Sequence, residues 1–273
     1  MAAIAEQVLR LTVWLCVLCA IFLPLERYFA VRQAQPGERQ RWPDLFYYFA
    51  NSLLPLILLA APLALAAQLS RMLLPAVVPQ TLAALPLAPR LLLALLVSDL
   101  GAYWMHRLAH RWPPLWRFHA VHHSATHVYF LTNTRAHPID LLLSRLCGLL
   151  PLYVLGLAGP SLAGSTTPVA VILLGTIWGF FIHANLRWRL GPLEWLLSTP
   201  AFHHWHHTRH DHVDRNFAAM LPVLDRLFGT LYLPSAWPAE YGTETPVATD
   251  LGGQLAGPFS PLPSVATVDK TKS

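Results

Sequence analysis

The chain has 273 residues, of which 55% are hydrophobic and only 12% are charged. Soluble domains carry about 25% charged residues, so this composition excludes an ordinary soluble enzyme and a disordered chain, and it indicates a protein whose solvent is the lipid bilayer. The formal net charge is +5. No run of Lys and Arg interleaved with aromatic residues accompanies that charge, so we expect no nucleic acid partner.

Five apolar segments predict an all-α integral membrane protein with four to five transmembrane helices and a cytoplasmic helical cap. A helix that crosses the bilayer needs about 20 mostly apolar residues. The expected spans are Val8–Leu25, Leu45–Leu69 with kinks at Pro55 and Pro62, Leu91–Trp104, Ile139–Leu157, and a last span that ends near Ala184.

Composition and charge divide the chain into three parts and orient it. Residues 1–90 hold the first two spans, residues 91–233 form the expected catalytic domain, and the Pro-rich residues 234–273 are expected to be disordered. With five spans, one side of the membrane holds only Arg10, Arg71 and Arg90 among the basic residues. The positive-inside rule then places the other side, with all the histidines, in the cytoplasm. The Leu-, Ala- and Arg-rich composition favours a bacterial inner membrane.

Histidines in three short boxes carry the strongest functional signal. Residues three and four apart project from one face of a helix, about 5–6 Å apart at Cβ. Two such imidazoles can grip one metal ion, and an HxxHH triplet can offer ligands to two neighbouring ions. A single further histidine lies at the cytoplasmic end of the last expected span. The candidate ligands are box one, His106 and His110; box two, His119, His122 and His123; box three, His203, His206 and His207; and the single His183.

The types of residue in the boxes narrow the choice of metal. No Glu lies within a box, which argues against an HExxH zinc hydrolase, and the Glu-x-x-His pairs of soluble di-iron bundles are absent. Neutral imidazoles suit two borderline ions, of which iron is the redox-active candidate. Carboxylates are then expected behind the ligands. Asp99 lies on one helical stripe with Tyr103, His106 and His110, so we assign it to this outer support.

The sequence around the boxes resembles a known family over roughly residues 91 to 233. The strings that carry the resemblance are Asp99–His110, Leu115–Ser124, Arg135–Pro138, Leu190–Trp195, Thr199–His207 and Leu224–Thr230. They are similar to the fatty acid hydroxylase / sterol desaturase superfamily of membrane di-iron enzymes. The resemblance implies that the nine box and single histidines ligate two iron ions.

The resemblance also singles out residues outside the boxes. His137 matches a recurrent position and is a candidate ligand or outer hydrogen-bond donor, and Asp214 and Asn216 match an Asp-x-Asn pattern after box three. His204 fills the variable slot of box three and is not expected to be a ligand. The remaining histidines are expected at the surface or in loops: His127, His210 and His212.

The implied activity is an O2-dependent hydroxylation or desaturation of an unactivated C–H bond in a lipid, whether fatty acyl, sterol, carotenoid or ether lipid. No cytochrome b5-like, flavin or iron–sulfur motif is present, so electrons are expected from a separate donor protein, a ferredoxin or a cytochrome b5-like protein with its reductase. Two alternatives stay open. A membrane metal-binding or transport protein would need polar residues along a path through the bilayer, and a metal-dependent lipid hydrolase would work without O2.

Overall fold

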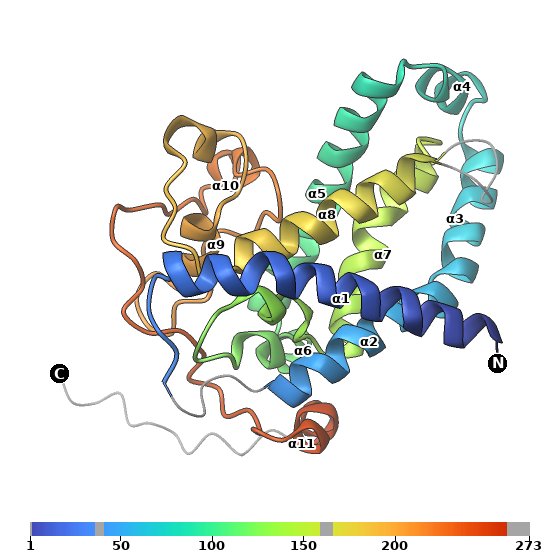
Figure 1. Cartoon of the computed structure of the whole chain (residues 1–273). Helices are drawn as coiled ribbons and strands as arrows, with labels where there is room; N and C mark the ends of the chain where they lie inside the picture. The colour runs from blue at the N-terminus through green and yellow to red at the C-terminus, as the bar shows by residue number, and fades with distance from the viewer. Residues whose placement is uncertain (1, 36–40, 159–165, 261–273) are drawn as a thin grey trace, which may run out of the picture.

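The computed structural model describes residues 2–35, 41–158 and 166–260 (Figure 1). Within these ranges the regular structure is helical, and the one extended pairing is an isolated bridge between Thr208 and Tyr241. The prediction of an all-α protein is therefore confirmed. By length and composition, three described helical segments could cross a membrane: Ile4–Phe29, Arg41–Leu73 and Leu87–Arg111.

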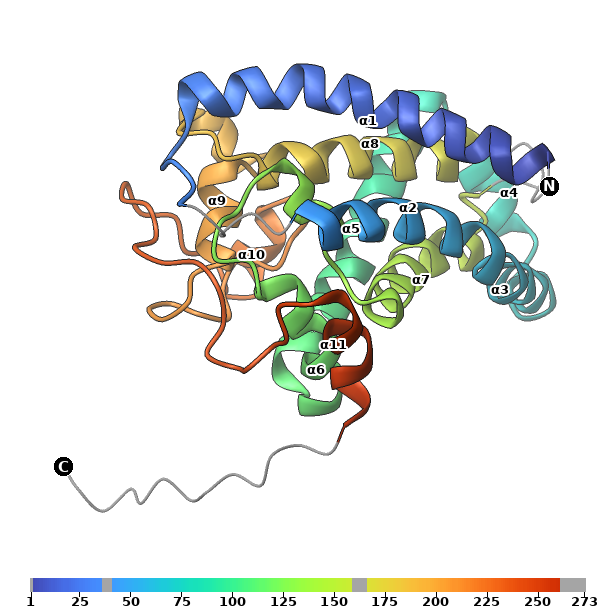
Figure 2. The ribbon, with the colours of Figure 1, turned by 60° about the horizontal axis from the view of Figure 1, so that its bottom comes forward.

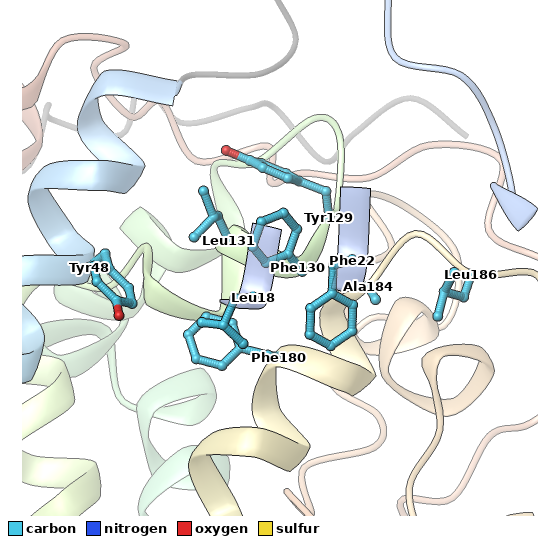
Figure 3. Packing of buried hydrophobic residues seen from close by; sticks show 9 residues of the cluster. All are labelled: Leu18, Phe22, Tyr48, Tyr129, Phe130, Leu131, Phe180, Ala184 and Leu186. Atoms are coloured by element: carbon cyan, nitrogen blue, oxygen red, sulfur yellow. The ribbon is translucent and has the colours of Figure 1, made fainter. Parts of the chain in front are cut away.

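The N-terminal helix lies beside the apolar helix that ends at His183. Both Figure 1 and Figure 2 show α1 (Ala2–Phe29) alongside α8 (Thr166–His183). Figure 3 shows the buried cluster between them, in which Phe22 of α1 stacks on Phe130 with ring centroids 5.3 Å apart. Phe180 of α8 packs into the same cluster. This contact fixes the end of α8 that carries His183.

The second expected span is interrupted at one residue, Leu59. α2 (Arg41–Leu58) ends one residue before α3 (Ala60–Leu73) begins. Pro62 has no backbone N–H, so it cannot donate the helical hydrogen bond to the carbonyl of Leu58, and the helix is interrupted there. A proline is tolerated in the first turn of the next helix, α3, because the N–H groups of a first turn have no helical partner in any case. The break lies beside Pro62, where the sequence predicts a kink, and α2 and α3 together still make one candidate span, Arg41–Leu73. The short α4 (Val77–Ala83) follows.

α5 (Leu87–Arg111) and α7 (Pro138–Val154) form the central helix pair. Gly101 makes their close approach possible, because a Cβ at that position would lie 2.1 Å from the carbonyl oxygen of Cys147. α5 extends well beyond the predicted Leu91–Trp104 and so carries box one on its last turns. α7 and α8, the expected fourth and fifth spans, have 17 and 18 residues, and the number of crossings stays a prediction.

The remaining elements gather at one end of these helices and form a cap. They are α6 (Pro113–His123), η1 (Phe130–Thr134), η2 (Gly191–Trp195), α9 (Pro200–His206), α10 (Val223–Leu227), α11 (Leu251–Ala256) and η3 (Gly257–Phe259).

The segment after residue 233 belongs to this cap. Trp205 donates from its indole nitrogen to the carbonyl of Ala236, and Trp116 donates to the hydroxyl of Thr245. Tyr241 is 2% exposed. The predicted disorder is therefore wrong for residues 234–260, where backbone acceptors and buried aromatic rings hold the chain. Residues 261–273 lie outside the described part.

Candidate metal centre

Four helices bring the three boxes and the single histidine together. Box one lies on the last two turns of α5, box two on the last turns of α6, and His183 is the last residue of α8. His203 and His206 of box three lie on α9, and His207 is the residue directly after it. α9 starts at Pro200, and Thr199 before it accepts a hydrogen bond from the N–H of Phe202. Proline at the first helical position and a threonine N-cap are typical helix starts. These starts fix the direction in which α9 points its histidines.

The nine histidines form two groups, in each of which the candidate ligand atoms all lie within 4.8 Å of one another. Both HxxHH triplets divide between the groups: the i and i+4 residues of each share one group, and the i+3 residue joins the other. We name the groups by their size. The five-histidine group is His106, His110, His119, His123 and His206; the four-histidine group is His122, His183, His203 and His207.

The two groups adjoin each other. The rings of His122 and His123 are 5.5 Å apart between centroids, and those of His123 and His207 are 4.8 Å apart. Both triplets thus place neighbouring residues on opposite sides of a shared boundary. This arrangement would allow each HxxHH triplet to offer ligands to two neighbouring ions.

The spacing of nitrogen atoms in the four-histidine group fits a metal ion. The Nε2 atom of His183 lies 3.3 Å from Nε2 of His122 and 2.9 Å from Nε2 of His203, and Nε2 of His207 lies 3.1 Å from that of His203. Metal–nitrogen bonds of about 2.1 Å place neighbouring ligands roughly 3.0 to 3.4 Å apart. Several imidazole nitrogens at this separation have a common point within bonding reach.

The five-histidine group passes a second test of fit. In every one of its members the Nε2 atom is buried and has no hydrogen-bond partner among the described residues. A buried polar nitrogen without a partner costs free energy, and five that converge within 4.8 Å share one physical explanation. Both groups therefore fit a metal ion.

Outer partners hold most of these rings by the other nitrogen. In the five-histidine group, His119 donates from Nδ1 to Asp140 at 3.0 Å and His110 donates to Asp214 at 2.9 Å. The remaining ring-orienting bonds run to main-chain carbonyls: His106 to Phe217, His206 to Arg215, His122 to Arg135, and His183 to Gly179. Such bonds fix the tautomer and leave Nε2 facing the ion.

Asp140, which the sequence did not single out, is a candidate outer partner because it accepts a hydrogen bond from His119. It is buried in the first turn of α7. A carboxylate at the start of an apolar helix is costly in free energy unless it is paired. Its presence in the sequence there could therefore have indicated a buried partner. Asp99, which was expected to support the ligands, instead accepts hydrogen bonds from the backbone N–H groups of Ala219, Met220 and Leu221. It holds the loop after box three and contacts no box histidine through a described hydrogen bond.

The same loop explains Asp214 and Asn216. Both residues have left-handed backbone conformations, with φ of 59° and 58°, which Asp and Asn tolerate better than most residues. The twist turns Asp214 toward His110, as expected of an outer partner. Asn216 bonds to the backbone of Phe202 and Tyr232, so it joins α9 to the loop rather than contacting a ligand.

The other five histidines lie outside the two groups. His137 accepts from the N–H of Ile139 and donates to the carbonyl of Leu255, so it caps α7. His204 accepts from the Tyr241 hydroxyl and donates to the carbonyl of Ala184. His210 and His212 are exposed, as expected. His127 is in a loop, as expected, and is only 1% exposed.

Burial keeps several of the candidate ligands neutral, His122, His203 and His207 among them. Desolvation, helped by neighbouring imidazoles, lowers the pKa of His122 to about 3. The same causes hold the pKa of His203 and His207 well below the ordinary histidine value. A neutral imidazole retains the lone pair that a metal needs.

The fold and the site together define a helical protein with long apolar helices and two adjoining groups of histidines, each of which could hold a metal ion. Comparison with known proteins identifies the family: the model for fatty acid hydroxylase matches residues 91–230. The chain therefore belongs to the fatty acid hydroxylase family, and with its long apolar helices it is an integral membrane protein.

Several curated proteins are similar to the chain. Ornithine lipid hydroxylase OlsE of Rhizobium tropici is 36% identical over 177 residues, which cover 64% of this chain and 52% of that protein. Alkylglycerol monooxygenase of Danio rerio is 36% identical over 158 residues, 58% of this chain and 33% of that protein. Very-long-chain aldehyde decarbonylase GL1-6 of Oryza sativa subsp. japonica is 28% identical over 144 residues, 47% of this chain and 20% of that protein. The chain thus spans about half or less of these relatives, and no solved structure matches it.

Proposed function

We propose that this protein is an O2-dependent di-iron enzyme that hydroxylates a membrane lipid. One observation carries the proposal: two adjoining groups of buried histidines, with converging Nε2 atoms, lie in a chain of the fatty acid hydroxylase family. The nine histidines are the proposed ligands. Residues 91–233 are the proposed catalytic unit, with the histidine centre on the cytoplasmic side of a bacterial inner membrane.

The protein's own contribution is to hold the ligands oriented and dry. The Nδ1–H groups of His119 and His110 donate hydrogen bonds to Asp140 and Asp214, so Nε2 stays free for the metal. The rings of His122 and His207 are buried, which excludes bulk water from the site. When bound, the iron pair would activate O2 with electrons from a donor and supply the oxidising power for attack on a C–H bond.

The printed names of the relatives support the substrate class. They name a lipid hydroxylase, an alkylglycerol monooxygenase and a very-long-chain aldehyde decarbonylase. Two of the three name oxygen insertion, so we favour hydroxylation over desaturation. A lipid can reach the centre sideways from the bilayer, because box one lies at the end of the candidate span Leu87–Arg111. A separate ferredoxin or cytochrome b5-like protein is the proposed electron donor.

Metal analysis tests the centre. We would measure iron by elemental analysis and Mössbauer spectroscopy on the detergent-purified chain, for wild type, His122→Ala and the exposed His210→Ala control. The proposal predicts about two coupled irons per chain in wild type and in His210→Ala, with the coupled signal lost in His122→Ala. Stoichiometric zinc from iron-replete cells, with no iron uptake on reconstitution, would overturn the iron assignment.

Oxygen labelling tests the reaction. Cells that express the wild-type chain under 18O2 should contain a lipid heavier by one 18O atom than the same lipid in cells that express His122→Ala. A lipid change that also occurs without O2 would favour a metal-dependent lipid hydrolase. A dehydrogenated lipid without label would favour desaturation.

A further inference from the structure

The two histidine groups differ in what supports them from outside. In the five-histidine group, the partners that orient the rings are Phe217, Asp214, Asp140 and Arg215. The loop that holds Phe217 is fixed in turn by Asp225, which accepts from the N–H groups of Phe217 and Ala218. All of these residues lie within the family match at residues 91–230.

The four-histidine group is supported by only two outer bonds among the described residues. His122 donates to the carbonyl of Arg135, and His183 donates to the carbonyl of Gly179. The Nδ1 atoms of His203 and His207 are buried without a described partner. The orientation of this group therefore depends on where the two carbonyls are held.

Asp44 of α2 holds the segment that carries the Arg135 carbonyl, because it binds the side chain of Arg135. Its carboxylate accepts from Nε and Nη2 of Arg135 at 2.6 and 2.9 Å, and also from the Tyr129 hydroxyl. Asp44 and Arg135 are both at most 1% exposed. Asn51, two turns further along α2, donates to the carbonyls of Thr134 and Ala136. The turn that presents the Arg135 carbonyl to His122 is thus fixed from both sides.

Glu26 of α1 binds the segments next to the second support, the Gly179 carbonyl that accepts from His183. One of its carboxylate oxygens accepts from the N–H of Phe130 at 2.8 Å and from the N–H of Asn185 at 3.0 Å. Asn185 lies two residues after His183, and Phe130 begins η1. η1 touches α8 at Gly179, where a Cβ would lie 2.4 Å from the Asn133 side chain. Glu26 therefore ties η1 to the end of α8 that carries His183.

We propose that Glu26 and Asp44 are positioning residues that hold the four-histidine group in shape. Both lie on the N-terminal helices, outside the family match, and both are buried carboxylates on apolar helices. Such groups are costly unless they perform a specific task. α1 and α2 thus do more than anchor the protein, since they set the second metal subsite. The inference rests on the proposed function to the extent that it requires two metal ions.

Cobalt titration of the metal-free, detergent-purified full chain tests the proposal. The number of Co²⁺ ions bound per chain and their dissociation constants would be measured for wild type, Asp44→Asn, Glu26→Leu and Glu6→Gln. Glu6 is the matched control, since it is an exposed carboxylate of α1 that pairs with Arg10. Wild type and Glu6→Gln should bind two ions with equal strength to each other. In the two test variants one ion should bind as in wild type and the other about 10- to 100-fold more weakly.

The retained ion reports that the chain is folded and separates positioning from general damage. Glu26→Gln keeps an acceptor oxygen and should restore most of the lost affinity. In a His122→Ala background, which already disables the four-histidine group, Asp44→Asn should cause no further loss. If Asp44→Asn fails to fold because Arg135 is left buried without its counter-charge, the pair Asp44→Asn with Arg135→Gln removes both charges and takes its place.

Two results would overturn the inference. One is two ions at wild-type affinity in both test variants, and the other is an equal weakening of both ions. A wild-type chain that binds fewer than two ions would instead overturn the metal pair of the proposed function. The two failures are therefore distinguishable in one titration.

Discussion

Asp140 offers the sharpest test of how the five-histidine group works. Its Oδ2 accepts a hydrogen bond from Nδ1 of His119 at 3.0 Å. The side chain of Asp140 is only 7% exposed and that of His119 only 6%. Asp140→Asn keeps the size and an acceptor oxygen but removes the negative charge. Asp214, behind His110 at 2.9 Å, is the matched comparison, because its side chain is 41% exposed.

The size of the loss in metal affinity should depend on how deeply each carboxylate is buried. Loss of an outer partner of a histidine ligand weakens metal binding by about 10- to 100-fold, or roughly 1.4 to 2.7 kcal/mol. The Asp140 charge is shielded from water, so Asp140→Asn should reach the upper end of that range at one of the two ions. Water and salt screen the exposed Asp214 carboxylate, so Asp214→Asn should weaken binding by less than about tenfold.

Competition titration against a chelator measures both effects on the same scale. Co²⁺ dissociation constants would be compared for wild type, Asp140→Asn, Asp214→Asn and the exposed control His210→Ala. The reasoning is refuted if Asp140→Asn binds as tightly as wild type, or if Asp214→Asn has the larger effect. Repetition at high salt should shrink the effect of Asp214→Asn and leave that of Asp140→Asn unchanged.

Three further predictions address stability. Burial lowers the pKa of His122 to about 3, so below about pH 6.5 the unfolded chain binds more protons than the folded one. The free energy of unfolding of the metal-free protein should therefore fall by about 2 kcal/mol at pH 5 from this group alone. A series of thermal melts from pH 8 to 5 would detect this as a falling midpoint. Asp99→Ala removes a carboxylate that accepts three backbone N–H bonds and should cost on the order of 3 kcal/mol; an unchanged melting midpoint would contradict this. Asn216→Gly, which suits the φ of 58°, should melt above Asn216→Ala, and the reverse order would show that backbone strain is not limiting.

Local periodicity predicted the histidines well because a helix face is a local property. Boxes one and two lie on α5 and α6, where residues three and four apart share a face. All nine selected histidines lie in the two groups. The choice of Asp99 as outer support used the same local logic and was wrong, since its stripe neighbours are not its hydrogen-bond partners.

Contacts between distant segments escaped prediction. Asp140 is 21 residues from His119, and Asp44 is 91 residues from Arg135. Neither pairing has a local period in the sequence. The C-terminal segment was misjudged for the same reason: its Pro-rich composition suggested disorder, yet Tyr241 is buried against His204. Composition describes a segment alone, whereas order here comes from the surface on which the segment packs.

Buried carboxylates reveal how a site of neutral ligands is held in an apolar protein. Nine imidazoles offer no charge of their own to offset metal ions, and without ions their close nitrogens are unfavourable neighbours. The chain places Asp140, Asp99, Asp225, Asp44 and Glu26 one step or more behind the rings, where each accepts hydrogen bonds at low exposure. Charged acceptors form stronger bonds than neutral ones, so these residues can fix carbonyls and loops against the cost of gathering so many imidazoles. Because two of the five lie on α1 and α2, a catalytic unit cut at residue 91 should keep its boxes and lose the shape of its four-histidine group.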